Sequence, residues 1–367
     1  MRRVACAVTL AVMCCAMSAK PGPRAPEPPA PPSGVSPWPA GLPVYDHIVI
    51  VIEENKDYDQ IIGSAKAPYI NGVLKAEGAS LTRMFAEEHP SEGNYFWLFS
   101  GANQGVGFED KIPTEKTAAG YPFKAPNLGE QLLATGRLSF KGYAEDLPST
   151  GSTVDKSGLY ARKHVPYVSF ANVPGGEAGT SSNLGFRDFP DASHFDALPT
   201  VAFVIPNLAN DMHNCYPPTC IAAGLDCCIA MGDEWLRKNL DAYYQWAKTH
   251  NSLLILTFDE NDDKSGYKGL TNPMVDPESR EPCGGVDSKS KRRQLCVDLQ
   301  NRIPTIFAGA HIKPGDYAEG QGVTHVNVLR TLEAMYGLAK SGAQQPNALG
   351  YGIGDSTLIT DVFNQAK

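Results

Sequence analysis

The sequence predicts an α/β fold, a mostly parallel sheet with helices on both faces. Three runs rich in β-branched and aliphatic residues, at 47–52, 201–205 and 252–257, are typical of strands buried on both faces of a parallel sheet. Helical patterns lie between these runs. Because strands that alternate with helices are joined by crossover connections, the strands are expected to run parallel.

The other elements are predicted from caps and periodicity. A helix begins at Asn127, which has capping-box spacing to Glu130, and ends at Gly136. The remaining predictions are helices at 69–76, 233–250 and 326–336, and strands at 138–143 and 303–308.

Length and composition favour one large catalytic domain. The chain has 367 residues, and its hydrophobic share of 42% is ordinary for a globular protein with a full core. Two loop-rich stretches are expected to form cap insertions, because long loops in a compact α/β domain are functional or cross-linked. The expected segments are a signal peptide at 1–19, a proline-rich linker at 20–44, a catalytic domain at 45–345 with insertions at about 144–198 and 262–300, and a C-terminal tail at 346–367.

The N-terminus has the pattern of an export signal. Arg2 and Arg3 precede an apolar run at 4–17, with small residues at the expected cleavage positions, and the run is too short to span a membrane. The sequence therefore predicts a periplasmic or extracellular protein without stable membrane insertion. A lipid anchor at Cys14 or Cys15 is a minor alternative, because the residues before Cys14 match a lipidation site poorly.

Cysteine usage agrees with export. Six of the nine cysteines lie beyond the signal, an even number in an oxidising compartment. A thiolate zinc site is the rival interpretation, but paired C-x-x-C motifs are lacking. Disulfides are therefore preferred: Cys283 with Cys296 in one polar insertion, and Cys215, Cys220, Cys227 and Cys228 among themselves.

Charge excludes one class of partner. The formal net charge is −8, and the densest basic run, at 289–293, is too short to track a nucleic-acid backbone. Nucleic acid is therefore not an expected partner. Clustered carboxylates fit a metal site better than an anion site built from protein cations alone.

Polar side chains follow the predicted strands where each one ends. In an open α/β sheet ligands bind at the carboxyl ends of the strands. Taken singly, each residue has a structural interpretation, as a loop start, a turn or a cap. As an ordered set they predict a site for one or two divalent metals. The set is Glu54, Asn55, Asp211, His213, Asp259, Glu260 and His325.

Ser91 is the candidate nucleophile. It stands just before a helix-like apolar run, where unpaired backbone N–H groups and the helix dipole favour a phosphoryl group. Asn94, three residues on, offers an amide to a phosphoryl oxygen. The alternative is that Ser91 only caps the helix.

Six segments together resemble the phosphoesterase family of acid phosphatases and bacterial phospholipases C, within the alkaline phosphatase superfamily. They span roughly residues 47 to 340 in the family's order. Glu92-Gly93 departs from it, because the phosphatase-like members more often have an apolar residue and proline there. The segments are HIVIVIEENK from His47, HPSEGNYFWLFSGA from His89, YARKHVPYVSFA from Tyr160, VAFVIPNLANDMHNC from Val201, LILTFDENDD from Leu254 and GVTHVNVLRTLEAMYGLA from Gly322.

The resemblance implies a role for each matched residue. Ser91 matches the nucleophile and also a metal ligand, and Asn94 matches the phosphate-contacting asparagine. Two further sets match metal ligands, and a third matches substrate contacts. In the third set, a purely structural role for His164 is an equally good interpretation. These sets are Glu54, Asn55, Asp259 and Glu260 beside the nucleophile; Asp211, His213 and His325 in a second cluster; and Lys163 with His164.

The expected activity is therefore that of a secreted, metal-dependent phosphoric monoester hydrolase of the acid phosphatase type, acting on a small phosphoester through a phosphoserine. A phospholipase C-type phosphodiesterase is the first alternative, although the family's phospholipases tend to be longer. A non-catalytic metal- or phosphate-binding protein on the same scaffold is the second. A sulfatase is discounted because the Pro-x-Arg pattern after its nucleophile is missing. The metal's identity and number, the substrate and the oligomeric state stay open.

Overall fold

The structure is a computed structural model and describes residues 39–106, 110, 112–176, 179–213, 216, 220, 224–262, 301–318, 322–350 and 352–364. All of them belong to one compact unit, Ser36–Lys367. The predicted signal peptide, almost all of the linker and the insertion from 263 to 300 lie outside the described residues.

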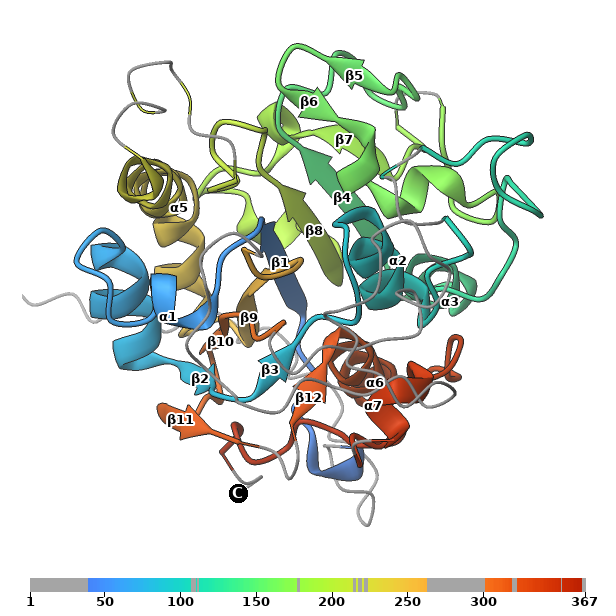
Figure 1. Cartoon of the computed structure of the whole chain (residues 1–367). Coiled ribbons are helices and arrows are strands. Elements are labelled where there is room, and N and C mark those ends of the chain that lie inside the picture. Colours follow the sequence, from blue (N-terminus) through green and yellow to red (C-terminus); the bar gives the residue numbers. More distant parts are fainter. Residues whose placement is uncertain are drawn as a thin grey trace, which may run out of the picture. The chain divides into compact units, whose positions relative to one another are not determined.

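A single large sheet organises the described part of the chain (Figure 1). Its eight strands lie in the order β11-β2-β10-β9-β1-β8-β4-β7. The bounds are β1 His47–Glu53, β2 Ala79–Leu81, β4 Phe140–Ala144, β7 Asn183–Gly185, β8 Val201–Ile205, β9 Ser252–Phe258, β10 Thr305–Gly309 and β11 Gly315–Tyr317. Two-stranded pairs are formed by β3 Met84–Phe85 with β12 Val323–Thr324, and by β5 Lys156–Ser157 with β6 Tyr160–Ala161.

The predicted mostly parallel α/β fold is confirmed, with one antiparallel strand in the sheet's interior. The pairs β9–β1, β1–β8, β8–β4 and β4–β7 are parallel. β10, predicted as the strand at 303–308, runs antiparallel to both β9 and β2. The sheet is therefore mixed, because an apolar run indicates burial but not direction.

Helices cover both faces of the sheet. α5 lies on one side, and α2, α3 and α6 lie on the other (Figure 1). Phe99 of α2 packs against Phe140 and Phe203 of the strands, while Tyr243 of α5 donates to Leu253 O on the opposite face. The helix bounds are α1 Tyr58–Ile61, α2 Glu92–Ser100, α3 Leu128–Ala134, α5 Leu225–Ala247, α6 His325–Tyr336 and α7 Pro346–Gly350, with a π-helical turn at Ile70–Lys75. Short 3₁₀ turns lie at Pro39–Gly41, Arg162–His164, Pro166–Ser169, Phe186–Asp188 and Phe195–Ala197.

Residues after α7 pack into the domain. Val362 and Phe363 belong to the hydrophobic core, and Phe363 forms a β-bridge with Ile312. Asp355 accepts from the buried Arg330 of α6. None of the helices in the described ranges combines the length and the apolar character needed to cross a bilayer.

One predicted disulfide group is seen in part. Cys220 and Cys227 are bonded to each other, which joins the start of α5 to the segment before it, and Cys228 is also disulfide-bonded. The pairing of Cys283 with Cys296 falls outside the described residues and stays a prediction.

Candidate active site

The parallel register brings the strand ends to one edge of the sheet. Glu53 pairs with Phe258, and Ala144 pairs with Ile205. The residues that follow these strands therefore start from neighbouring positions. Asp259 N donates to Glu53 O (3.0 Å), and Glu54 N donates to Asp211 O (2.7 Å), so the three loops are tied together by their backbones.

Ser91 lies at the N-terminus of α2, facing two of the predicted ligands. The side chain is buried, with 1% exposure, and its Oγ donates to Glu260 Oε1 (3.2 Å) and lies 3.4 Å from Asn55 Oδ1. Asn55 links the set, because its Nδ2 donates to Glu260 Oε1 (2.7 Å) and its backbone N donates to Asp259 Oδ1 (3.0 Å). The structure thus gathers three of the predicted site residues, Asn55, Asp259 and Glu260, around the Ser91 hydroxyl.

Among the residues that the structure describes, only one oxygen of Asp259 has hydrogen-bond donors: Oδ1 accepts from the backbone amides of Asn55 and Glu260. The Oδ2 of Asp259 is buried without a hydrogen-bond partner in the described part of the chain. Burial, followed by the charges of Glu54 and Glu260, raises the pKa of Asp259 well above its usual range. An ionised carboxylate in such a place needs a cation.

Glu54, which the resemblance matched to the set beside the nucleophile, contacts His213 of the second cluster as well as His164. Its Oε1 lies 2.6 Å from His164 Nε2 and accepts from Tyr95 Oη (2.9 Å), and its Oε2 lies 3.3 Å from His213 Nδ1. Glu54, His164 and Asp211 each place one ligand atom within 4.8 Å of the others. His164, for which the resemblance implied a substrate contact, therefore lies among the candidate metal ligands.

The two histidines hold the Glu54 charge. Burial acts to raise the pKa of Glu54, but the nearby His164 and Lys163 outweigh it, so that the pKa lies well below its usual range. Burial acts to lower the pKa of His213, yet its hydrogen bond to Glu54 and the charge of that carboxylate raise it overall. Together, the lowered pKa of Glu54 and the raised pKa of His213 favour an ionised Glu54 beside a protonated His213.

The residues present fit a divalent metal. Asp259 supplies an unpartnered buried oxygen, and the Glu54, His164 and Asp211 group supplies converging oxygen and nitrogen atoms. Carboxylate oxygen with imidazole nitrogen is a donor set suited to zinc, manganese or iron, whereas magnesium and calcium prefer oxygen alone. The residues that would hold a metal beside Ser91, namely Asn55, Asp259 and Glu260, offer oxygen atoms alone, which also suits magnesium or manganese.

Lys163 is already paired. Its Nζ lies 2.6 Å from Asp110 Oδ2, while Asp110 Oδ1 accepts from Glu92 N, the backbone amide next to Ser91 (3.0 Å). The Asp110 carboxylate therefore binds both the Lys163 ammonium and the backbone amide of Glu92, at the helix N-terminus beside the candidate nucleophile. Glu92 is buried next to this pair, and burial raises its pKa to about 9.

Asn94 and His325 are engaged in other ways than the resemblance implied. Asn94 Oδ1 accepts from the backbone amides of Glu87 and Glu88, and its Nδ2 donates to Glu88 O, so one amide hydrogen is left for a phosphoryl oxygen. His325 has Nδ1 2.7 Å from Glu87 Oε2 and Nε2 2.8 Å from Phe258 O. To act as a metal ligand, His325 would have to give up one of these contacts.

Sequence reasoning missed three side chains of the site. His89 Nδ1 lies 2.7 Å from Glu260 Oε2, and Tyr95 reaches Glu54. Tyr95 had a readable signal, because residues i and i+4 of a helix share a face and Ser91 is one turn before it. Asp110 had none, because it follows α2 and does not stand at the end of a predicted strand.

The departure at Gly93 is explained by Glu88. A β-carbon on Gly93 would lie 1.6 Å from Glu88 Oε1. The glycine therefore leaves room for a buried carboxyl group, which accepts from Asn103 Nδ2 through both oxygens (3.1 and 3.0 Å).

Comparison with known proteins decides the family. The model of the Phosphoesterase family matches residues 66–339, three quarters of the sequence and most of the site just described. The chain belongs to the Phosphoesterase family. Over 303 residues, 83% of this chain and 81% of the relative, it is 43% identical to a phosphatidylinositol-3-phosphatase of Mycobacterium tuberculosis. It is also 29% identical to a phosphate-repressible acid phosphatase of Penicillium chrysogenum, over 60% of this chain and 49% of the relative.

These relatives make the chain a phosphoester hydrolase of the phosphatase class. It spans about half the length of the fungal acid phosphatases that it matches. Among solved structures, a protein of the alkaline phosphatase superfamily from Vibrio parahaemolyticus aligns with a TM-score of 0.50 and 12% identity, over 83% of this chain and 69% of that one. That likeness concerns the fold alone.

Proposed function

We propose that this member of the Phosphoesterase family is a secreted, metal-dependent phosphoric monoester hydrolase that acts through a phosphoserine at Ser91. The observation that carries the proposal is the Ser91 hydroxyl, buried at the start of α2 and hydrogen-bonded to Glu260 beside Asn55. Export is supported by the disulfide between Cys220 and Cys227, since disulfides persist in oxidising compartments.

The carboxylates around Ser91 set up its attack. Ser91 Oγ donates to Glu260 Oε1, so the carboxylate is placed to receive the hydroxyl proton as the oxygen attacks phosphorus. A divalent cation bound by Asn55, Asp259 and Glu260 would supply positive charge for the serine oxygen and the phosphoryl oxygens. Attack breaks the bond from phosphorus to the leaving oxygen, and phosphorus becomes bonded to Ser91.

Asn94, Lys163 and His213 complete the reaction. The remaining amide hydrogen of Asn94, and Lys163 once the substrate displaces Asp110 from it, can stabilise the negative charge that spreads over the phosphoryl oxygens. His213, beside Glu54, is placed to pass a proton to the leaving oxygen and to take one from water. Water then releases phosphate and restores the Ser91 hydroxyl.

The substrate proposed first is a phosphoinositide monoester. The 43% identical relative is named a phosphatidylinositol-3-phosphatase, and that match covers most of both chains. The acid phosphatase relatives are matched at lower identity and over about half of their length. A lipid with one ring phosphate is therefore the first substrate to test, with the soluble headgroup as its companion.

A substrate panel tests the proposal. The purified protein is assayed with p-nitrophenyl phosphate, dispersed phosphatidylinositol 3-phosphate, inositol 1,3-bisphosphate, bis(p-nitrophenyl) phosphate and phosphatidylcholine. The proposal expects turnover of the monoesters with release of phosphate. Preferential turnover of the diesters would indicate a phospholipase C-type enzyme. Absence of turnover with every substrate and divalent metal would indicate a binding protein instead.

A further inference from the structure

A loop between β8 and α5 carries two residues of the second cluster. The stretch 207–213 begins at the buried Asn207 and contains Asp211 and His213. Asn207 Oδ1 accepts from Ala209 N and Asn210 N, and Asn207 O accepts from Asp211 N (3.0 Å). The loop is thus a compact turn whose geometry depends on how Asn207 and Asn210 are held.

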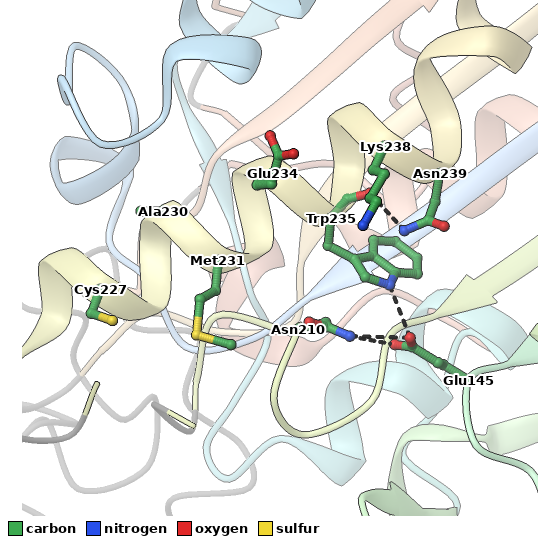
Figure 2. A pocket seen from close by; sticks show the side chains of 9 residues that line it. All are labelled: Glu145, Asn210, Cys227, Ala230, Met231, Glu234, Trp235, Lys238 and Asn239. Atoms are coloured by element: carbon green, nitrogen blue, oxygen red, sulfur yellow. Dashed lines mark hydrogen bonds between the residues drawn. The ribbon is translucent and has the colours of Figure 1, made fainter. Parts of the chain in front are cut away.

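Glu145, the residue after β4, holds both of these asparagines, and Figure 2 shows its contact with Asn210. Asn207 N donates to its Oε2 (2.9 Å), and Asn210 Nδ2 lies 3.1 and 2.9 Å from the two oxygens. Trp235 Nε1 of α5 donates to Oε1 (3.0 Å). Glu145 N donates to Ile205 O, so its own backbone is fixed to the end of β8.

Only an acceptor suits this position. The backbone amide, the asparagine amide and the indole all donate, and an ionised carboxylate accepts through both oxygens. A glutamine of the same shape would turn an NH₂ group toward one of these donors. The mutation would therefore leave at least one N–H group unpaired without changing the volume of the side chain.

The loop is hydrogen-bonded directly to the candidate metal ligands. Asp211 O accepts from Glu54 N (2.7 Å), and Asp211 Oδ1 accepts from His213 N (2.9 Å). A shift of the turn at Asn207 and Asn210 would therefore move Asp211 relative to Glu54.

The opposite side of the loop rests on α5. A β-carbon on Gly232 would lie 2.3 Å from Met212 Cγ and 2.9 Å from Asn210 O. The loop is thus clamped between Glu145 and the glycine face of α5. A cavity of about 660 Å³, lined by Glu145 and Trp235 among others, opens beside the carboxylate.

We propose that Glu145 is a positioning residue, which fixes the turn at Asn207 and Asn210 and thereby sets Asp211 and His213 against Glu54. The proposal rests on the proposed function only for its catalytic consequence. Its structural consequence can be measured in protein without metal or substrate.

Amide hydrogen exchange of Glu145→Gln is the primary test. We expect the amides of Glu54 and His213, which donate to Asp211, to exchange at least about tenfold faster than in wild type. Val49 and Val51, inside β1, should keep their protection. Apparent affinity for Mn²⁺ or Zn²⁺, measured by competition with a chelator, should weaken by about 10- to 100-fold, as is usual when the partner of a ligand is lost. With p-nitrophenyl phosphate, kcat should fall at saturating metal.

Two further variants keep the test decisive. Glu234→Gln changes an exposed acid beside the same cavity, which pairs with Arg237, and should alter none of these readouts. If Glu145→Gln fails to fold, Trp235→Phe removes one donor and keeps the ring, and the same two amides should show a smaller acceleration. Wild-type exchange at Glu54 and His213 in the folded variant would overturn the proposal. Inactive wild-type protein would instead refute the proposed function and leave the exchange result standing.

Discussion

Glu88 should make the protein more stable in mild acid than at alkaline pH. Its side chain is buried, Gly93 leaves it room, and burial raises its pKa to about 8. Between the usual value of 4.5 and about 8, the folded state keeps a proton that the unfolded state releases. Because the folded state binds more protons in this window, the free energy of unfolding falls as pH rises.

The size of the effect follows from the pKa. One pKa unit corresponds to about 1.4 kcal/mol, so Glu88 alone should remove about 3 kcal/mol of stability between roughly pH 5 and pH 8. Glu88→Gln mimics the protonated carboxyl group and can still accept from Asn103. The difference in unfolding free energy between wild type and this variant should therefore shift by about 3 kcal/mol across the window, in favour of the variant at high pH.

Urea unfolding at several pH values measures this difference. Glu77→Gln is the matched control, because Glu77 lies at the surface and its hydrogen bond with Lys248 lowers its pKa. Stability from Glu77 is lost only as pH falls below the usual carboxyl range, so this control should run parallel to wild type between pH 5 and pH 8. A Glu88→Gln curve that also runs parallel to wild type would refute the reasoning.

Three other predictions concern the site and its loops. Dialysis against a chelator should abolish turnover and one added divalent metal should restore it, since Asp259 and Glu54 repel each other without a cation; full activity in protein shown metal-free by elemental analysis would contradict this. Asp110→Asn should lower KM by about fivefold, because Lys163 and Glu92 N no longer bind an internal carboxylate; an unchanged or higher KM would show that Asp110 does not compete with substrate. Non-reducing peptide mapping of exported protein should find Cys283 bonded to Cys296, and a free Cys283, or one bonded within 215–228, would show this pairing to be wrong.

Much of the fold could be predicted because burial and caps are local signals. The β-branched runs become β1, β8 and β9, and the predicted cap at Asn127, whose side chain accepts from Glu130 N, starts α3. The antiparallel direction of β10 could not be predicted, since an apolar run indicates that a strand is buried but not which way it runs. α5 begins at Leu225, eight residues before the predicted start at 233. The cysteines in this stretch indicate a cross-linked loop, whereas the disulfide between Cys220 and Cys227 ties a helix to the segment before it.

The sequence could predict those site residues that directly follow a strand. Asn55, Asp259 and Glu260 follow strands, and the structure gathers them around Ser91. Which partner each of these side chains binds depends on residues from distant parts of the sequence. Glu87 was therefore not foreseeable as the partner of His325.

The most direct test of the central claim is the fate of the phosphoryl group. Wild-type protein is mixed with a phosphomonoester, quenched in acid and digested, and the peptide that contains Ser91 is examined by mass spectrometry. We expect one phosphoryl group on Ser91 in wild type. We expect none in Ser91→Ala, which should keep its fold and metal content but lose about 1,000-fold or more in kcat. Phosphorylation of another residue, or a Ser91→Ala variant that keeps more than about a tenth of wild-type kcat, would contradict the account.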